Sequence, residues 1–211
     1  MNVAPARFLT LEGGEGAGKS TQVRALAAAL AAHGIDAVVT REPGGSEGAE
    51  AIRALLLAGG IDRWSARSEA LLFAAARADH VERLIRPALS AGRWVICDRF
   101  LDSTRAYQGI GEGIDDAAIL ALHAFGSDGL LPDRTFVLDM PPAEGEARAA
   151  RRDGASADRF AARGPAFHEA VAHGFRAIID REPARVRVVD ATGAPEQVTG
   201  RLVAALADWL P

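Results

Sequence analysis

Apolar residues follow two different spacings along this 211-residue chain, and the two spacings alternate. Short, nearly continuous apolar runs bounded by turn-forming residues predict β-strands at residues 7–12, 35–40, 93–98, 135–139 and 186–190. Apolar positions three or four residues apart predict helices at 18–33, 49–57, 65–91, 116–125 and 195–210, with further helical segments between 139 and 186. Pro87 lies inside the long stretch 65–91, so we expect that helix to bend or break around it.

The alternation of strands and helices predicts the class of fold. Because crossover connections are right-handed, five strands separated by helices indicate an α/β fold with a five-stranded parallel sheet flanked by helices. A chain of this length suits one domain, 1–211. Ligands bind beyond the carboxyl ends of the strands in such a sheet. The glycine loop at 13–18, the loop at 41–45 and the pair Asp98-Arg99 all follow predicted strands, so we expect a site at that edge.

Composition narrows the classes of protein. With 49% hydrophobic and 25% charged residues, the chain can bury a full core. Its 24 basic and 28 acidic residues give a net charge of −4, which argues against a protein that coats nucleic acid. The single cysteine, Cys97, excludes an internal disulfide and fits a buried position in a reducing compartment. No apolar run approaches the roughly 20 residues of a membrane span, so we expect a soluble, cytoplasmic protein without nucleic-acid or membrane partners.

One short motif carries most of the chemistry. Residues 13–20, GGEGAGKS, match the P-loop pattern G-x-x-x-x-G-K-[ST], which chance would produce in roughly one such chain in a thousand. Between a strand and a helix, this motif cradles phosphates with backbone N–H groups, reaches the β- and γ-phosphates with its lysine and binds Mg²⁺ with its serine. An ordinary glycine turn before a helix is the alternative. We predict a P-loop NTPase-type fold that binds ATP through Gly13, Gly14, Glu15, Gly16, Ala17, Gly18, Lys19, Ser20 and Thr21, where Lys19 is the only lysine.

The residues after the third predicted strand extend the phosphate site. Asp98 ends a buried strand, where P-loop proteins place an acid near Mg²⁺, so we predict a magnesium site of Ser20 and Asp98. A strand-end or helix-capping role is the alternative for Asp98. Arg99 comes from the same edge and would lie beside the phosphates. Because Glu15 would repel a triphosphate, it faces either solvent or, as we favour, a second ligand that carries hydroxyl groups.

The segment 148–163 holds five arginines. Such a run can be the solvated basic face of a helix. The alternative is an arginine lid that excludes water and neutralises charge on a transferred phosphoryl group. The chain has neither an N-K-x-D motif of GTPases nor a His-Arg-Asp loop of protein kinases, which leaves small P-loop kinases. A phosphate acceptor, with a second pKa of about 6, needs no general base. The alternatives are a P-loop kinase for another nucleotide or nucleoside, and a nucleotide-binding ATPase module that uses no acceptor.

Longer motifs resemble the thymidylate kinase family. They are LEGGEGAGKST (11–21), TREPGG (40–45), LLFAAAR (71–77), CDRFLDSTRAYQG (97–109) and LLPDRTFVLD (130–139), followed by the arginine-rich segment, in family order over residues 7–209. The resemblance implies ATP-dependent phosphorylation of dTMP to dTDP, with Mg²⁺ as cofactor and ATP as co-substrate. It also implies a cis peptide bond between Glu42 and Pro43. A homodimer is implied as well, with a surface that includes Ala70, Phe73, Ala74, Ala78 and part of 115–125.

The resemblance also implies a role for each site residue. Glu15 would hold the 3′-hydroxyl of dTMP, Phe73 would stack on thymine and Arg77 would bond the carbonyl edge of the base. Tyr107, the only tyrosine, would lie under C2′ and leave no room for a ribose hydroxyl. Arg148 would lie near the adenine of ATP. The other implied dTMP residues clamp its phosphate (Arg53 and Arg99), support that corner (Arg41 and Glu42) or face the base or sugar (Thr104 and Gln108).

One position indicates a branch of the family, and two others depart from the family pattern. Gly16 follows the acid of the P-loop where one branch of the family has an arginine, which implies that the catalytic arginine comes from the lid. Arg152 or Arg159 is then the catalytic candidate, beside Lys19 and Arg99. The lid pattern Asp-Arg-x-Glu reads Asp158-Arg159-Phe160-Ala161 here, so an expected acid is missing. Phe100 stands where tyrosine or histidine is more usual, which matters little if the ring only packs.

Overall fold

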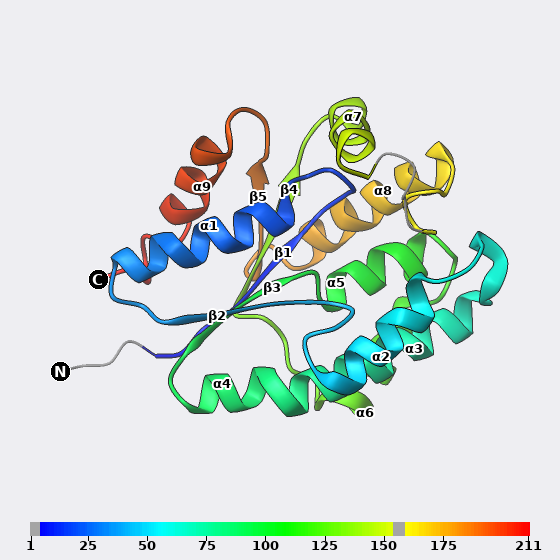
Figure 1. Cartoon of the computed structure of the whole chain (residues 1–211), viewed down its shortest axis with the longest axis horizontal. Coiled ribbons are helices and arrows are strands. Elements are labelled where there is room, and N and C mark those ends of the chain that lie inside the picture. Colours follow the sequence, from blue (N-terminus) through cyan, green and yellow to red (C-terminus); the bar gives the residue numbers. More distant parts are fainter. Residues whose placement is uncertain (1–4, 154–158) are drawn as a thin grey trace.

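The computed structural model describes residues 5–153 and 159–211, without the side chains of Pro142, Glu146, Ala150, Arg152 and Asp153. All five predicted strands are present and pair in parallel, in the order β2-β3-β1-β4-β5 (Figure 1). Their bounds are β1 Phe8–Glu12, β2 Ala37–Arg41, β3 Trp94–Asp98, β4 Arg134–Asp139 and β5 Val186–Asp190. The five-stranded parallel sheet is therefore confirmed, with strand ends within two residues of their predicted positions.

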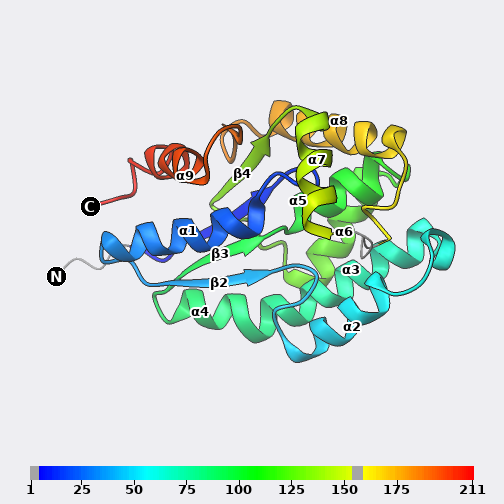
Figure 2. The same cartoon turned by 45° about the horizontal axis from the view of Figure 1, so that its top comes forward.

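Helices cover both faces of this sheet, as Figure 2 shows. On one face α1 (Lys19–Ala32) packs beside α9 (Pro195–Ala204). On the other face lie α4 (Arg86–Ser90), α5 (Leu101–Thr104), α6 (Asp116–Ser127) and α8 (Pro165–Arg181). Three further helices, α2 (Glu47–Leu57), α3 (Ala66–His80) and α7 (Pro142–Asp153), lie toward the carboxyl ends of the strands. Within the described ranges, no helix is both long and apolar enough to cross a bilayer.

Burial on both faces explains the nearly continuous apolar runs of the three central strands, β1, β3 and β4, whereas the edge strands β2 and β5 are only partly buried. All five residues of β1 are buried. Leu9 and Leu11 join the core under α1 and α9, while Phe8 joins the core on the opposite face with Val95 and Ile119. Successive side chains of a strand point to opposite faces, so both sets must be apolar or paired. Cys97 is buried among them, and this burial raises the pKa of its thiol, as suits a core residue.

The long stretch 65–91 forms one helical run with an irregular middle. It consists of α3, a π-helical turn at Val81–Ile85 and then α4. Proline has no N–H to donate, and its ring crowds the carbonyl four residues earlier, so the wider π turn before Pro87 accommodates it. The irregularity predicted around Pro87 is therefore confirmed, and it lies in the turn just before the proline. The last helix was predicted too long, since α9 ends at Ala204 and turns follow to Trp209.

The helical segment that follows β3 was not predicted. After β3 the chain forms α5 and continues as a π-helical turn, Arg105–Ile110. Its side chains do not follow an apolar helical period, because Thr104, Arg105 and Gln108 are all buried. Each of them is held by a polar partner from another part of the chain. Such pairing satisfies buried polar groups, and it leaves no hydrophobic pattern to detect.

Candidate active site

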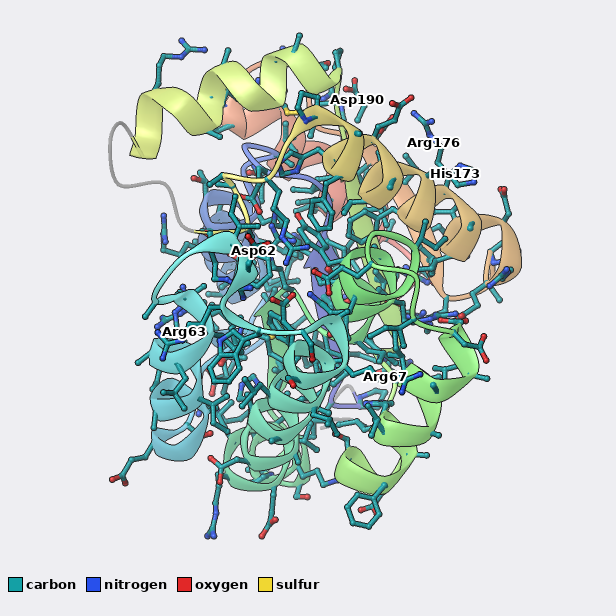
Figure 3. The ribbon with its side chains drawn as sticks, turned by 90° about the vertical axis from the view of Figure 1, so that its right-hand side faces the viewer. Asp62, Arg63, Arg67, His173, Arg176 and Asp190 are labelled. Carbon is teal, nitrogen blue, oxygen red and sulfur yellow. The ribbon has the colours of Figure 1, made fainter. Side chains whose placement is uncertain are left out.

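A cavity of about 860 Å³ opens at the carboxyl edge of the sheet. Polar side chains on the outer side of α8, such as His173 and Arg176, point away from the molecule (Figure 3) and do not line the cavity. Two of the predicted ATP-binding residues, Gly13 and Gly14, do not line the cavity. Their carbonyl oxygens accept hydrogen bonds from Lys19. Most predicted site residues line the cavity: Glu15, Gly16, Ala17, Gly18, Lys19, Ser20, Thr21, Arg41, Glu42, Arg53, Phe73, Arg77, Asp98, Arg99, Thr104, Tyr107, Gln108 and Arg148.

Lys19 begins α1 and lies against the loop that precedes it. Its Nζ atom donates to the carbonyls of Gly13 at 3.1 Å and Gly14 at 2.7 Å. Burial, and then the positive charge of Arg99, lower the pKa of Lys19 to about 8. A phosphate oxygen in the cavity would favour the charged ammonium. Phosphate binding and protonation of Lys19 therefore reinforce each other.

The structure explains why position 16 holds a glycine. Gly16 has a φ of +71°, and a Cβ atom there would overlap the carbonyl oxygen of Gly145 in α7. In turn, a Cβ atom on Gly145 would lie 2.8 Å from the carbonyl oxygen of Glu15. The helix that begins the arginine-rich segment thus lies directly on the P-loop. No room is left at position 16 for the side chain of an arginine.

Ser20 and Asp98 meet where β1 and β3 end. The Ser20 hydroxyl donates to Asp98 Oδ2. Hydroxyl and carboxylate oxygens are hard ligands, and Mg²⁺ in nucleotide sites usually takes one or two of them together with phosphate oxygens and water. The pair therefore fits an Mg²⁺ ion that shares its remaining coordination with bound phosphates.

Glu15 of the P-loop lines the cavity beside Arg99 and Tyr107. Its Oε1 atom lies 2.5 Å from Arg99 Nη2 and accepts the Tyr107 hydroxyl at 3.2 Å. The guanidinium carbon of Arg99 lies 5.0 Å from the centre of the Tyr107 ring. Burial raises the pKa of Tyr107, so the phenol keeps its proton and donates it. We call Glu15, Arg99 and Tyr107 the acceptor cluster, because these three side chains contact one another in the cavity and Glu15 is the P-loop residue for which we predict a hydroxyl-bearing ligand.

A buried ion pair fixes the corner after β2. Arg77 Nε lies 2.8 Å from Glu42 Oε2, and the two side chains are 3% and 4% exposed. Arg77 Nη2 donates to Thr104 Oγ1 at 2.8 Å, and His80 Nδ1 lies 3.1 Å from the other Glu42 oxygen. The Glu42–Pro43 peptide bond is cis, as predicted. These contacts hold the guanidinium of Arg77 at the cavity wall.

The remaining predicted dTMP residues lie around this corner. The Phe73 ring packs on Phe160, with ring centres 5.8 Å apart. Arg53 donates to the Pro43 carbonyl at 2.7 Å. Two more are held by glutamates: Arg41 pairs with Glu50 at 2.9 Å, and Gln108 Nε2 donates to Glu69 at 2.7 Å.

The far end of the cavity was largely missed by sequence reasoning. Arg148 of α7 pairs with Glu144 and donates to the Ala191 carbonyl at 3.3 Å. The wall there comes from the loop after β5 and the start of α9, a segment without any motif. The rule that loops after parallel strands face the ligand could have pointed to it. The missed lining residues include Ser103, Arg151, Phe160, Ala191, Gly193, Pro195 and Val198.

The structure describes the side chain of only one of the two arginines predicted as catalytic in the lid, Arg152 and Arg159. The side chain of Arg152 lies outside the described residues. Arg159 does not line the cavity, since its side chain is fully buried and pairs with the buried Glu69 at 2.5 Å. It also donates to the carbonyls of Leu56 and Ile61. A buried carboxylate needs a cation, and Glu69 binds Arg159 in this structure. Arg151, which was not predicted, does line the cavity.

Comparisons with known proteins agree on one family. Residues 11–201 match the family model described as thymidylate kinase. A thymidylate kinase of Rhizorhabdus wittichii is 64% identical over 207 residues, covering 98% of this chain and 100% of that protein. A thymidylate kinase of Caulobacter vibrioides is 52% identical, over 92% of this chain and 93% of that protein. The crystal structure of thymidylate kinase from Ehrlichia chaffeensis has a TM-score of 0.78 at 33% identity, covering 95% of this chain and 98% of that one.

Proposed function

Because the chain belongs to the thymidylate kinase family, we propose that its cavity holds ATP and dTMP side by side and transfers the γ-phosphoryl group between them. The chain is a phosphotransferase, and its reaction is the ATP-dependent phosphorylation of dTMP to dTDP. One observation supports this cavity as the place of reaction: the P-loop and the acceptor cluster line the same space. Direct transfer requires donor and acceptor sites that open onto each other.

The P-loop half of the cavity would hold ATP. Backbone N–H groups of residues 13–18 and the N-terminus of α1 face the phosphates, and Lys19 supplies positive charge. Arg148 and the wall at 191–198 would hold the adenine. Ser20 and Asp98 would hold Mg²⁺, which when bound supplies further charge neutralisation at the phosphates.

The acceptor half would hold dTMP. Glu15 would accept a hydrogen bond from the 3′-hydroxyl, and the Tyr107 ring would lie under C2′. Arg53 and Arg99 would clamp the phosphate, with Arg41 and Glu42 supporting that corner. The base would stack on Phe73 and meet polar groups of Arg77, Thr104 and Gln108 at its edge.

Charge neutralisation carries the transfer in this proposal. The acceptor phosphate is already ionised at neutral pH, since its second pKa is about 6, so no side chain must remove a proton. Lys19 and Arg99 act from the cavity wall, and a lid arginine completes the site. Arg152 and Arg159 stay proposed for that role, and Arg151 joins them because it lines the cavity. For Arg159 to act, its buried pair with Glu69 has to open.

We further propose a cytoplasmic homodimer of one-domain chains, 1–211, each with its lid at roughly 148–163. The lone cysteine is buried, which suits a reducing compartment. Of the stripe predicted on α3, Ala70 is buried and Phe73 lines the cavity, so neither can lie in the contact. Exposed apolar side chains there include Leu71 on α3, 55% exposed, and Phe125 on α6, 92% exposed. Apolar side chains that are this exposed suit a surface that a second subunit covers. Phe125→Glu should reduce the mass in solution to that of a monomer, while Val188→Glu on the edge strand β5 should not; a monomeric wild type at micromolar concentration would contradict the dimer.

A comparison of acceptors tests the proposed function. The measurement is kcat/KM with ATP for dTMP, dUMP, UMP, CMP and thymidine, together with ADP release when no acceptor is present. We expect dTMP to give the highest value and ADP release to depend on it. Preference for another acceptor would indicate a different P-loop kinase. Slow ADP release at the same rate with and without every acceptor would indicate an ATPase module.

A further inference from the structure

Glu12, the last residue of β1, is fully buried and has no role in the site described so far. Its Oε1 atom accepts the backbone N–H of Phe100 at 2.7 Å, and its Oε2 atom accepts the Ser103 hydroxyl at 2.5 Å. Ser103 Oγ in turn accepts from Arg99 Nη1 at 3.1 Å. A continuous chain of hydrogen bonds therefore joins the end of β1 to the guanidinium of Arg99.

The same carboxylate also holds the backbone beside Arg99. Arg99 has a φ of +67°, a left-handed conformation that is uncommon outside glycine and costs on the order of 1–3 kcal/mol. The N–H of Arg99 donates to Leu11 O, and the next N–H, that of Phe100, donates to Glu12. Two consecutive residues of β1, Leu11 and Glu12, therefore bind the N–H of the strained Arg99 and the N–H of the residue after it. The strain directs the Arg99 side chain back over the P-loop, where it reaches Gly13 O and Glu15.

Arg99 has two kinds of side-chain contact: its pairing with Glu15 involves a residue proposed to bind substrate, and its contact with Ser103 leads to a buried residue. Glu15 faces the cavity and is proposed to bind the sugar, so its pairing with Arg99 competes with substrate. The connection through Ser103 to Glu12 starts from a buried carboxylate that no substrate reaches. We propose that Glu12 is a positioning residue, which through Ser103 and the backbone of Phe100 directs Arg99 at the phosphate of dTMP. This inference rests on the proposed function, in which Arg99 binds that phosphate.

The proposal distinguishes the substitutions at position 12. Burial, and then the charge of Asp102, raise the pKa of Glu12 to about 8. When Glu12 is ionised, the Ser103 hydroxyl donates to its Oε2 atom; when Glu12 is protonated, that oxygen can donate to Ser103 Oγ, so a hydrogen bond joins the two side chains in both states. Glu12→Gln keeps one acceptor for Phe100 N–H and one donor for Ser103, so it should preserve the position of Arg99. Glu12→Ala removes both contacts, whereas Ser103→Ala removes the hydrogen bonds of Ser103 to Glu12 and to Arg99 and keeps the contact of Glu12 with the Phe100 N–H.

Thymidine provides the decisive comparison, because it shares the base and sugar of dTMP and lacks the phosphate. We would measure dissociation constants of dTMP and thymidine for each variant by calorimetry. Glu12→Ala and Ser103→Ala should weaken dTMP about tenfold, as expected for a misaligned charge-assisted hydrogen bond, and leave thymidine within about twofold. Glu12→Gln should resemble wild type. Ser103 is only partly buried, so Ser103→Ala carries the test if Glu12→Ala does not fold.

A matched control separates positioning from stability. Thr10 lies two residues before Glu12 on the same face of β1, and its hydroxyl bonds Thr135 at 2.8 Å in the core. Thr10→Val should lower the melting temperature and leave the ratio of the dTMP and thymidine constants unchanged. Combining Ser103→Ala with Arg99→Ala should weaken dTMP no more than Arg99→Ala alone.

Two results would overturn the proposal. A parallel loss of dTMP and thymidine affinity in Ser103→Ala would show a structural role only, and so would full additivity with Arg99→Ala. Failure of the proposed function has a different signature, because the wild-type protein would then bind dTMP no better than thymidine.

Discussion

Replacing Arg77 by methionine should destabilise the fold by about 3–5 kcal/mol, because it leaves the Glu42 carboxylate buried without its cation. The two side chains are 3% and 4% exposed, and their Nε and Oε2 atoms lie 2.8 Å apart. Methionine fills a similar length but cannot donate to Glu42, to Thr104 or to the Phe100 carbonyl. The cost therefore comes mainly from the uncompensated charge, with the lost hydrogen bonds adding to it.

A second substitution tests that cause. Glu42→Gln removes the charge that Arg77→Met leaves unpaired, so the double variant should lose less stability than the sum of the single variants, by at least about 2 kcal/mol. Arg83 provides the control. Its side chain is 70% exposed and its Nε atom lies 3.9 Å from Asp79, so Arg83→Met should cost no more than about 1 kcal/mol.

Urea unfolding, followed by circular dichroism, measures these differences if the slope m is the same for all variants. Thymidine affinity should also fall in Arg77→Met, since Arg77 lies on the cavity wall beside the proposed base site. The reasoning would be refuted if Arg77→Met cost as little as Arg83→Met, or if the effects of Arg77→Met and Glu42→Gln simply added.

Three further predictions concern other groups of the site. Tyr107→Ala should reduce the preference in kcat/KM for dTMP over its ribonucleotide, while Tyr107→Phe should keep it if the ring acts by overlap; an unchanged ratio in Tyr107→Ala would mean that the 2′ position is recognised elsewhere. Removing the lid arginine that acts in transfer should cut kcat by about 10³-fold, so rapid-quench rates of Arg151→Ala, Arg152→Ala and Arg159→Ala identify it; near-normal rates in all three would exclude a lid arginine. Because the pKa of Glu12 rises on folding from 4.5 to about 8, its stabilising effect is complete below pH 4.5 and is lost as the pH rises through 8. The unfolding free energy should therefore fall by up to about 1.4 kcal/mol per pH unit in that interval, and Glu12→Gln should remove this slope, whereas parallel pH profiles would contradict the shift.

The sheet and the edge that carries the site were predictable from local patterns. Each strand is short, apolar and bounded by loop residues, because both faces of the sheet are covered by helices. The P-loop spacing is equally local, since its loop, its lysine and the helix that follows are consecutive in the chain. These local patterns predicted the P-loop residues, Asp98 and Arg99, while the resemblance to the thymidylate kinase family supplied the other predicted residues that line the cavity.

The features that could not be predicted are side-chain contacts between residues far apart in the sequence. Which arginine reaches the cavity depends on carboxylates far along the chain: Glu69 binds Arg159 across 90 residues. The helical segment after β3 was missed for the same reason, because its buried polar side chains are paired with residues from other elements. The role of Glu12 could not be predicted either, because an acidic residue at the end of a strand is usually exposed. Only the structure shows that Glu12 is bonded to Phe100 and Ser103.

Following the label from γ-³²P-ATP into products tests the central claim most directly. In the presence of dTMP and Mg²⁺, the label should appear in the β-phosphate of dTDP, with one ADP formed for each dTDP. Without dTMP, little label should leave ATP. Release of the label as inorganic phosphate at the same rate with and without dTMP would contradict transfer in this cavity.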